Sequence, residues 1–507
     1  MENSYEYVII GAGISSLNLA LLLSRINKKV LILEKNDRIG GNHSSYNKDG
    51  FFFEHGPRIY IDNYLNFKEM LKLMNSDFND FFIKSKFSIF DFSKQALKFL
   101  KVLDIIKFSI ALLTLSKKDK KKDLLAYCKK KKFTEKAIDY FDKICRLSDG
   151  GNIENFTLYE FLQIINQNIL YKTFQPKFEN NLGFLKCYED FLINNGVVIK
   201  LNSQIINIDD NQVKDVNNNI HYFKNLIITI PPFNFFNKEI FIPKKNINID
   251  EFINKTNYIT YVNITFHFKE NILQNRYLAS LPDSDWFLAH VFLSDYINFN
   301  NYTVISSLIC NCDSKSKVLD KTVNEISDKN IIIKEVFRQL NEFYNNQLPN
   351  YHVALLEDNF YDDIKQKWIP KNTAFMNTKY GFLENQTKIK NVYCCSTANG
   401  NSNYAFTSVE SATQNAIFLF NKLYPENQIR IFKIVSMLQV LFIIFFILIT
   451  SISLYLMFKL IIFLSNKFRN PKFRKDNIFT KDVLQNNYNI DEEDDNLYED
   501  RFMNDWL

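Results

Sequence analysis

Three short apolar runs open the chain and alternate with polar turns. Residues 7–10 and 30–33 are continuously apolar over the length of a strand, and residues 17–26 between them are mainly apolar over the length of a helix. Short apolar runs bounded by turn residues are typical of strands buried on both faces. The pattern therefore predicts a strand–helix–strand unit with parallel strands, which is the start of an α/β fold.

The turn between the first strand and the helix has the spacing that a dinucleotide requires. Gly11 permits a sharp turn, and Gly13 lets backbone N–H groups approach a pyrophosphate at the positive helix N-terminus. Ser15 follows, and Ser16 is a small residue where helix and strand must pack closely. Glu34, about 20 residues further on, can accept hydrogen bonds from ribose hydroxyls. We expect a dinucleotide site here; the alternative is a purely structural glycine turn.

Two longer segments have different patterns. In residues 86–180 leucine and isoleucine recur at helical spacing between lysines, which predicts an amphipathic helical lobe. The lobe either contacts a membrane surface or is soluble with a solvated lysine face, and both remain open. Residues 245–385 combine strand alternation at 258–269 and 303–310 with a helix candidate at 331–344, which predicts a mixed sheet-and-helix domain. The apolar stripe of the lobe consists of Leu97, Leu100, Leu103, Ile106, Ile110 and Leu113.

The longest apolar stretch lies near the C-terminus. Residues 434–458 carry no charged side chain, and a helix of this length can cross a bilayer. We expect a single membrane span, with a longer tilted helix or a re-entrant hairpin as open alternatives, because the apolar run resumes after Lys459. No secretory signal precedes the first strand, so we expect a cytosolic catalytic body, although the positive-inside rule favours a cytosolic tail. Residues 466–507 are polar and acidic and are expected to be disordered.

Composition narrows the class of protein. The chain has 507 residues, 46% of them hydrophobic, so it can bury a large core and should form at least two domains. Its seven cysteines lack metal-ligand spacing, which favours a reducing compartment and no metal site. The net charge of +6 says little about nucleic acid, and we expect no nucleic-acid partner.

The segments after Glu34 distinguish FAD from other dinucleotides. The sequence from Arg38 to Gly41, Arg-Ile-Gly-Gly, resembles the turn that wraps FAD in the flavin-containing amine oxidase and protoporphyrinogen oxidase superfamily. Residues 53–58, Phe-Glu-His-Gly-Pro-Arg, resemble the next segment of that superfamily, in which a glycine turn passes close to the isoalloxazine. The resemblance implies noncovalent FAD. Motif and resemblance together assign cofactor contacts to Gly11, Gly13, Ser15, Ser16, Glu34, Lys35, Arg38, Gly40, Gly41, Asn42, Gly56, Pro57, Arg58, Ile206, Thr397, Thr407, Ser408 and Val409.

Two later blocks resemble the same superfamily. Residues 196–208 and 225–232 look like the strand pair that returns the chain to the FAD domain. Residues 391–416 resemble the closing flavin motif, in which a helix N-terminus faces the flavin and stabilises its anionic reduced form. Relatives have Gly-Asp or Gly-Glu where this chain has Ser396 and Thr397, so the contact to the ribityl chain departs from the family pattern.

The expected architecture is an α/β fold in which a Rossmann-like FAD domain is interleaved with a mixed α+β substrate domain and followed by a transmembrane helix. The FAD domain takes residues 1–85, 181–244 and 386–425, and the remaining parts are the helical lobe 86–180, the substrate domain 245–385, the span 434–458 and the tail 466–507.

The resemblance also implies an activity. Such enzymes transfer a hydride from a small or lipophilic substrate to flavin N5, and O₂ then reoxidises the flavin. Some amine oxidases use a lysine to hold a water beside N5, which makes Lys367 a catalytic candidate; the alternative is a surface lysine beside a core tryptophan. His55 can accept a proton near neutral pH, and Arg58 lies in the same flavin-proximal segment.

Two other functions stay open at this point. The same motifs also resemble UDP-galactopyranose mutase, a flavin-dependent isomerase whose substrate diphosphate requires arginines. A catalytically inactive flavin fold that serves as a membrane-tethered binding protein is the third interpretation, because of Ser396 and Thr397. The motifs leave the substrate, the membrane and the oligomeric state undetermined.

Overall fold

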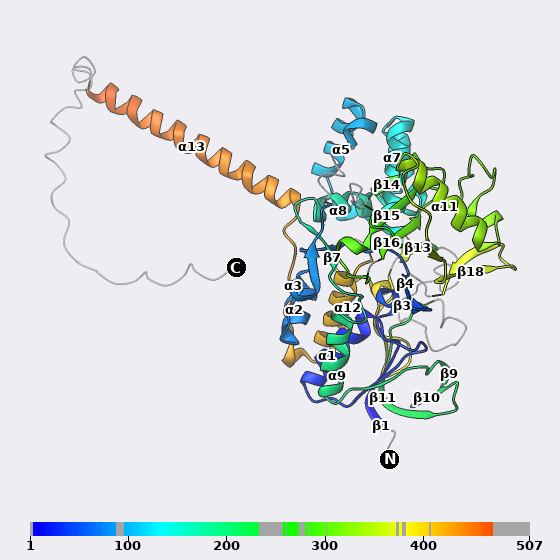
Figure 1. The fold of residues 1–507 in the computed structure, drawn as a ribbon. Coiled ribbons are helices and arrows are strands. Elements are labelled where there is room, and N and C mark those ends of the chain that lie inside the picture. Colours follow the sequence, from blue (N-terminus) through cyan, green and yellow to red (C-terminus); the bar gives the residue numbers. More distant parts are fainter. Residues whose placement is uncertain are drawn as a thin grey trace, which may run out of the picture. The chain divides into compact units, whose positions relative to one another are not determined.

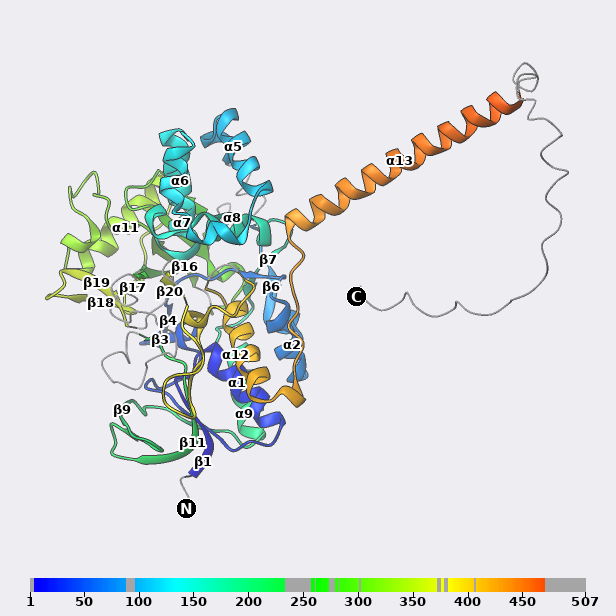
Figure 2. The ribbon, with the colours of Figure 1, turned by 180° about the vertical axis from the view of Figure 1, so that it is seen from behind.

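The computed structural model describes residues 4–87, 96–232, 257–259, 261–272, 279–281, 283–300, 302–371, 375–377, 382–404 and 407–469. The chain divides into two compact units, residues 1–438 and 439–507. Figures 1 and 2 show the fold from opposite sides.

A seven-stranded sheet forms the base of the first unit. Its strands are β1 (Ser4–Ile10), β2 (Val30–Leu33), β8 (Val198–Lys200), β9 (Ile205–Ile208), β10 (Gln212–Asp215), β11 (Ile220–Ile228) and β21 (Val392–Cys394). β1 pairs in parallel with β2 and β11, β2 with β8, and β11 with β21, whereas β9 and β10 are antiparallel. Strands from three distant parts of the chain thus meet in one sheet, which confirms the Rossmann-like α/β fold.

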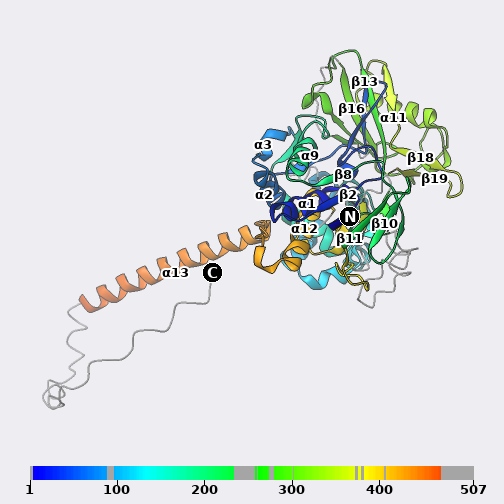
Figure 3. The ribbon, with the colours of Figure 1, turned by 90° about the horizontal axis from the view of Figure 1, so that it is seen from below.

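Helices cover one face of this sheet, and these are α1 (Ile14–Arg25), α2 (Leu65–Leu73), α9 (Phe184–Asn194) and α12 (Val409–Leu423). α1 and α12 lie side by side, next to β2 and β8 in Figure 3. Residues 14–24 of α1 are all buried, which explains why this helix is apolar on every side. Its polar Asn18 donates to the Ile14 carbonyl and to Thr413 Oγ1, both at 3.0 Å.

The helical lobe consists of α5 (Val102–Leu113), α6 (Leu124–Lys130), α7 (Glu135–Asp149) and α8 (Leu158–Asn168). Leu112, Phe141 and Phe161 lie in its buried core. The helical pattern ends earlier than residue 180, because β7 (Thr173–Pro176) pairs with β5 (Tyr60–Ile61) and β6 (Phe82–Lys84) in a small sheet.

A five-stranded antiparallel sheet, in the order β14-β15-β16-β13-β17, lies within residues 245–385, where we expect the substrate domain. α11 (Lys329–Phe343), expected at 331–344, packs on it through Ile332, Val336 and Leu340. The strands of the sheet are β13 (Val262–Phe268), β14 (Ala279–Leu281), β15 (Leu288–Phe292), β16 (Thr303–Ile309) and β17 (Val353–Leu355).

Short elements connect these layers: α3 (Phe78–Phe81) and the antiparallel pairs β3 (Ser45–Lys48) with β4 (Phe51–Glu54), β12 (Asn257–Ile259) with β20 (Phe375–Asn377), and β18 (Asn359–Asp362) with β19 (Lys367–Pro370).

The apolar C-terminal stretch forms one continuous helix, α13 (Met437–Arg469), among the described residues. By length and composition its residues Met437–Lys467 can cross a membrane, with a mean hydropathy of 2.7 over the most apolar window. The helix begins later and ends further on than the expected span at 434–458. Most of the expected disordered tail, from residue 470 onward, lies outside the described residues.

Candidate active site

A cavity of about 880 Å³ opens at the carboxyl ends of β1, β2 and β11 and reaches the helical lobe. Small-molecule sites typically enclose roughly 300–1,000 Å³, and ligands of open α/β sheets bind outside the carboxyl ends of the strands. This is the candidate site. Among the predicted site residues, all line it except Ser16, Arg38, Ile206 and Lys367.

The first glycine turn has the geometry that its sequence predicts. Gly11 has a φ of +96°, and an added Cβ would meet Ile230 Cγ2 at 2.7 Å and Thr229 Oγ1 at 2.8 Å. Gly13 precedes the first turn of α1, and an added Cβ there would meet nothing within 4 Å. Ser16 does not line the cavity: its buried hydroxyl donates to the Gly11 carbonyl at 2.5 Å. Gly11 and Ser16 therefore shape the turn, while Gly13 faces open space.

Glu34 directly follows β2 and lies beside this turn. Its Oε2 accepts a hydrogen bond from the Ala12 N–H at 2.7 Å, and its Oε1 accepts one from the Asn36 N–H at 3.0 Å. Burial raises the pKa of Glu34 above its ordinary value, although these backbone N–H groups act in the opposite direction. Ile205 lines the cavity nearby, but Ile206 points the other way and is 43% exposed, as the alternation of side chains along a strand dictates.

The second glycine turn packs against the first. Gly40 has a φ of +112° and its N–H donates to the Ala12 carbonyl at 2.8 Å, while a Cβ added to Gly41 would come within 3.3 Å of Gly13 Cα. Arg38 lies behind this turn, outside the cavity. Its guanidinium pairs with Asp37 and donates to the Ser45 carbonyl at 2.8 Å. Arg38 therefore supports the turn and does not line the site.

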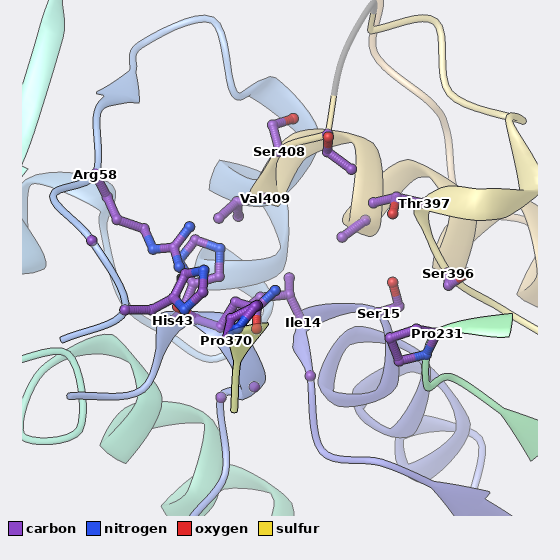
Figure 4. Close-up of a pocket in the computed structure, with 18 of the residues that line it drawn as sticks. Ile14, Ser15, His43, Arg58, Pro231, Pro370, Ser396, Thr397, Ser408 and Val409 are labelled. Atoms are coloured by element: carbon purple, nitrogen blue, oxygen red, sulfur yellow. Dashed lines mark hydrogen bonds between the residues drawn. The ribbon is translucent and has the colours of Figure 1, made fainter. Parts of the chain in front are cut away.

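The N-terminus of α12 faces the cavity from the opposite side. Thr407, Ser408 and Val409 line the cavity, and the Ser408 hydroxyl caps the helix by accepting a hydrogen bond from the Ser411 N–H at 3.0 Å. The end of a helix that carries free N–H groups is electropositive. Thr397 lies beside it in Figure 4, at the wall of the cavity.

Arg58 and His43 lie together at the other end of the same view (Figure 4). The Arg58 guanidinium donates to the Asn42 carbonyl, and His43 Nδ1 shares a hydrogen bond with the Tyr60 hydroxyl at 3.0 Å. Burial, with a smaller contribution from Arg58 and then His55, holds the pKa of His43 well below its ordinary value. Burial thus disfavours the charged form of His43. From the sequence, His43 and His55 both lie in flavin-proximal blocks, and either is a candidate proton acceptor.

His55 lines the cavity and is buried. Its Nδ1 is bonded to the carboxylate of Asp358, a residue that comes just before β18. Because the two residues are distant in sequence, no local motif could reveal this pair.

The structure does not bring Lys367 to the cavity. Lys367 is exposed on β19, whereas Lys365, in the turn before it, lines the cavity together with Lys371. Lys365 Nζ lies 3.6 Å from Asp362 Oδ2. Which of the two lysines lines the cavity depends on the conformation of the β18–β19 turn, and the sequence carries no clear signal for that conformation.

The end of the cavity away from the glycine turns is mainly apolar, although Ser148 and Asn168 also line it. Ile144 and Leu147 of α7, Ile164 of α8 and Leu308 of β16 line it. The helical lobe and the five-stranded sheet thus supply a wall suited to an apolar ligand.

Comparisons with known proteins agree with this architecture. Residues 9–73 match the family model of an NAD(P)-binding Rossmann-like domain. The chain is 46% identical to UDP-galactopyranose mutase of Mycoplasma genitalium over 66 residues, 12% of this chain and 16% of that protein. It is 41% identical to all-trans-retinol 13,14-reductase of Danio rerio over 65 residues, 13% and 10% of the two chains. It is 40% identical to chloroplastic protoporphyrinogen oxidase of Nicotiana tabacum over 55 residues, 11% and 10% of the two chains. These matches thus span a sixth or less of each relative.

Two solved structures share the fold over most of its length. Putrescine oxidase bound to putrescine has a TM-score of 0.58 at 12% identity, with 83% of this chain and 99% of that chain covered. An oxidoreductase from Methanosarcina mazei has a TM-score of 0.54 at 14% identity, with 82% and 99% covered. Together these findings confirm the resemblance of the chain to the flavin-containing amine oxidase and protoporphyrinogen oxidase superfamily, a group of FAD-dependent oxidoreductases.

Proposed function

We propose that the protein is a membrane-anchored, FAD-dependent oxidoreductase that removes a hydride equivalent from a lipophilic substrate. One observation carries this proposal: a single cavity joins a polar end, at the glycine turns and Glu34, to a mainly apolar end between α7, α8 and the five-stranded sheet. A dinucleotide suits the polar end, and an apolar substrate suits the other.

The residues of the polar end fit FAD. The open space in front of Gly13 admits a pyrophosphate at the α1 N-terminus, and the Glu34 carboxylate can accept hydrogen bonds from ribose hydroxyls. Thr397 would contact the ribityl chain in place of the acid of relatives. Ser408 starts a helix whose positive end favours the anionic reduced flavin. When bound, FAD supplies the two-electron acceptor, while the chain binds, orients and excludes water.

The apolar end favours a lipophilic substrate. Ile144, Leu147 and Ile164 offer no charge there, and two of the relatives are named for retinol and protoporphyrinogen. Arg58 and His43 lie at the wall, where Arg58 can orient a polar group of the substrate. We propose Lys365, which lines the cavity, rather than Lys367, which does not, for a lysine that holds water near the flavin. Reoxidation by O₂ completes the proposed cycle.

The isomerase alternative is less well supported. Recognition of a substrate diphosphate favours several bidentate arginines, and among the described residues that line the cavity Arg58 is the single arginine.

Two features support a membrane location. α13 is long and apolar enough to span a bilayer once. In the first unit, α5 turns its apolar stripe to the exterior, with Val102 72% exposed and Leu103 67% exposed. A helix that exposes such a stripe is suited to lie in a membrane interface.

Anaerobic mixing of the flavin-loaded protein with candidate substrates tests the proposal. A lipophilic amine, a porphyrinogen or a polyene that bleaches the flavin bands, followed by recovery in air, is the expected result. Conversion of UDP-galactopyranose by the pre-reduced protein, without substrate-dependent bleaching, would establish the isomerase instead.

A further inference from the structure

A buried histidine–carboxylate pair lies at the wall of the cavity. His55 Nδ1 is bonded to Asp358 Oδ2, and each side chain is only 3% exposed. The other ring nitrogen, Nε2, is buried and has no hydrogen-bond partner among the described residues. A buried polar atom without a partner costs free energy unless water or a ligand satisfies it. His55 also lines the cavity, and we infer that a group bound there is the partner of Nε2.

The pair is held by the structure around it. The Asp358 carbonyl accepts a hydrogen bond from the Lys371 N–H at 2.8 Å. The next residue, Asn359, donates to the Tyr261 carbonyl at 2.7 Å and accepts from the Asn263 N–H at 3.3 Å. These contacts tie the start of β18 to β13, so Asp358 is fixed opposite His55.

We propose that His55 accepts a proton from the substrate through Nε2 and that Asp358 positions it for this role. The inference rests on the oxidoreductase function proposed above. An X–H or C–H bond of the substrate breaks and its proton goes to His55 Nε2, while a hydride from the adjacent C–H goes to the FAD named above. The substrate thus loses two electrons and two hydrogens, and His55 later releases its proton to water.

The hydrogen bond between Asp358 and His55 determines which ring nitrogen of His55 can accept a proton. A carboxylate accepts only, so Asp358 selects the tautomer with hydrogen on Nδ1 and leaves a lone pair on Nε2. An asparagine can donate instead and so select the opposite tautomer, in which Nε2 already carries hydrogen and cannot accept. The charged and titratable groups near the pair are Arg58, His43 and Glu54.

The protein contains a second buried pair that serves as a matched control. His221 Nε2 lies 3.4 Å from Asp215 Oδ2, both side chains are fully buried, and neither residue lines the cavity. If the loss of any buried carboxylate partner slowed the reaction, both substitutions, Asp358→Asn and Asp215→Asn, would slow it. If the reaction needs His55 as proton acceptor, only Asp358→Asn slows it.

The test uses full-length protein in detergent with ¹⁵N-labelled histidine. The chain has six histidines, and H55Q assigns the His55 signal. The tautomer with hydrogen on Nδ1 is expected in the wild type, and a switch to Nε2 in Asp358→Asn with unchanged flavin content. The rate of flavin reduction by whichever lipophilic amine, porphyrinogen or polyene bleaches the wild-type flavin should fall in Asp358→Asn by about 10²–10⁴-fold and stay within about twofold in Asp215→Asn.

Three results would overturn the inference. Hydrogen on Nε2 of His55 in the wild type excludes a proton acceptor there, whether or not a substrate is known and whether or not Asp358→Asn folds. If the tautomer of His55 switches in Asp358→Asn but the rate of flavin reduction is unchanged, the pair has a structural role. The same conclusion follows if Asp215→Asn slows flavin reduction as much as Asp358→Asn does. A wild type that binds no flavin, in contrast, contradicts the proposed function itself.

Discussion

The carboxylate of Glu34 accepts a hydrogen bond from the backbone N–H of Ala12 at 2.7 Å. This bond joins the end of β2 to the first glycine turn, so the acid that should recognise ribose also holds the turn that should recognise pyrophosphate. This hydrogen bond therefore links the part of the site expected to bind ribose to the part expected to bind pyrophosphate.

Replacement of Glu34 by alanine should weaken FAD binding. The variant loses a ribose hydrogen bond to a charged acceptor, which contributes about 1.5–3 kcal/mol, so a loss of affinity of about ten- to a hundredfold is expected. Fluorescence titration of the apoprotein with FAD measures it. Glu6→Ala is the control, because Glu6 lies at the opposite end of β1, where it pairs with Lys28. This variant should bind FAD normally. An equal loss of FAD affinity in both variants would contradict the assignment of Glu34 to the ribose.

Thr397 is expected to replace the acidic residue of relatives at the ribityl chain. Thr397→Val keeps the shape of the side chain and removes the hydroxyl, and one neutral hydrogen bond contributes about 0.5–1.5 kcal/mol. The rate of FAD dissociation should therefore rise by roughly two- to tenfold. We assign this contact to Thr397 and not to Ser396, because the Ser396 hydroxyl already accepts a hydrogen bond from the Ala398 N–H. An unchanged dissociation rate in Thr397→Val would remove Thr397 from the site.

Glu54 should make stability depend on pH. Burial raises the pKa of Glu54 from 4.5 to about 7, so the folded state binds its proton more tightly than the unfolded state. Stability is then lost as pH rises between these two values, by up to roughly 3 kcal/mol. The melting temperature of Glu54→Gln should exceed that of the wild type at about pH 8 and approach it at about pH 5. If the difference in melting temperature between the two proteins does not change with pH, the Glu54 carboxyl is not the cause of the pH dependence of stability.

The exposed stripe of α5 should bind lipid without the help of α13. In a chain truncated after residue 438, Leu103→Glu with Ile106→Glu should reduce sedimentation with anionic liposomes several-fold, because charged side chains are costly to insert. Val318→Glu changes an equally exposed residue elsewhere in the first unit and should leave sedimentation unchanged. Equal sedimentation of all three proteins would favour the soluble lobe.

The sequence predicted the parts of the fold that depend on local patterns. The glycine turn, the two apolar strands and α1 follow from periodicity and from the special backbone of Gly11, so their positions were correct within a few residues. Helix 331–344 was similarly accurate. The region 86–180 was only partly helical, because β7 forms through pairing with distant β5 and β6, which no local pattern encodes.

The site was predictable where residues follow a motif and less so elsewhere. Lys367 and Ile206 were assigned from the resemblance, but each lies one or two positions from the neighbour that lines the cavity, Lys365 or Ile205. Side-chain direction along a strand or turn depends on exact register, which a motif match does not define. Asp358 was missed because only the folded chain brings it to His55.

The visible absorption spectrum of the purified full-length protein, before and after anaerobic dithionite, tests the central claim most directly. Gly13→Val serves as the matched variant, since an added Cβ meets no protein atom within 4 Å but occupies the space assigned to the pyrophosphate. The account predicts flavin bands that bleach in the wild type and are absent from an equally folded Gly13→Val. A folded wild type that is colourless and takes up no added FAD would contradict it.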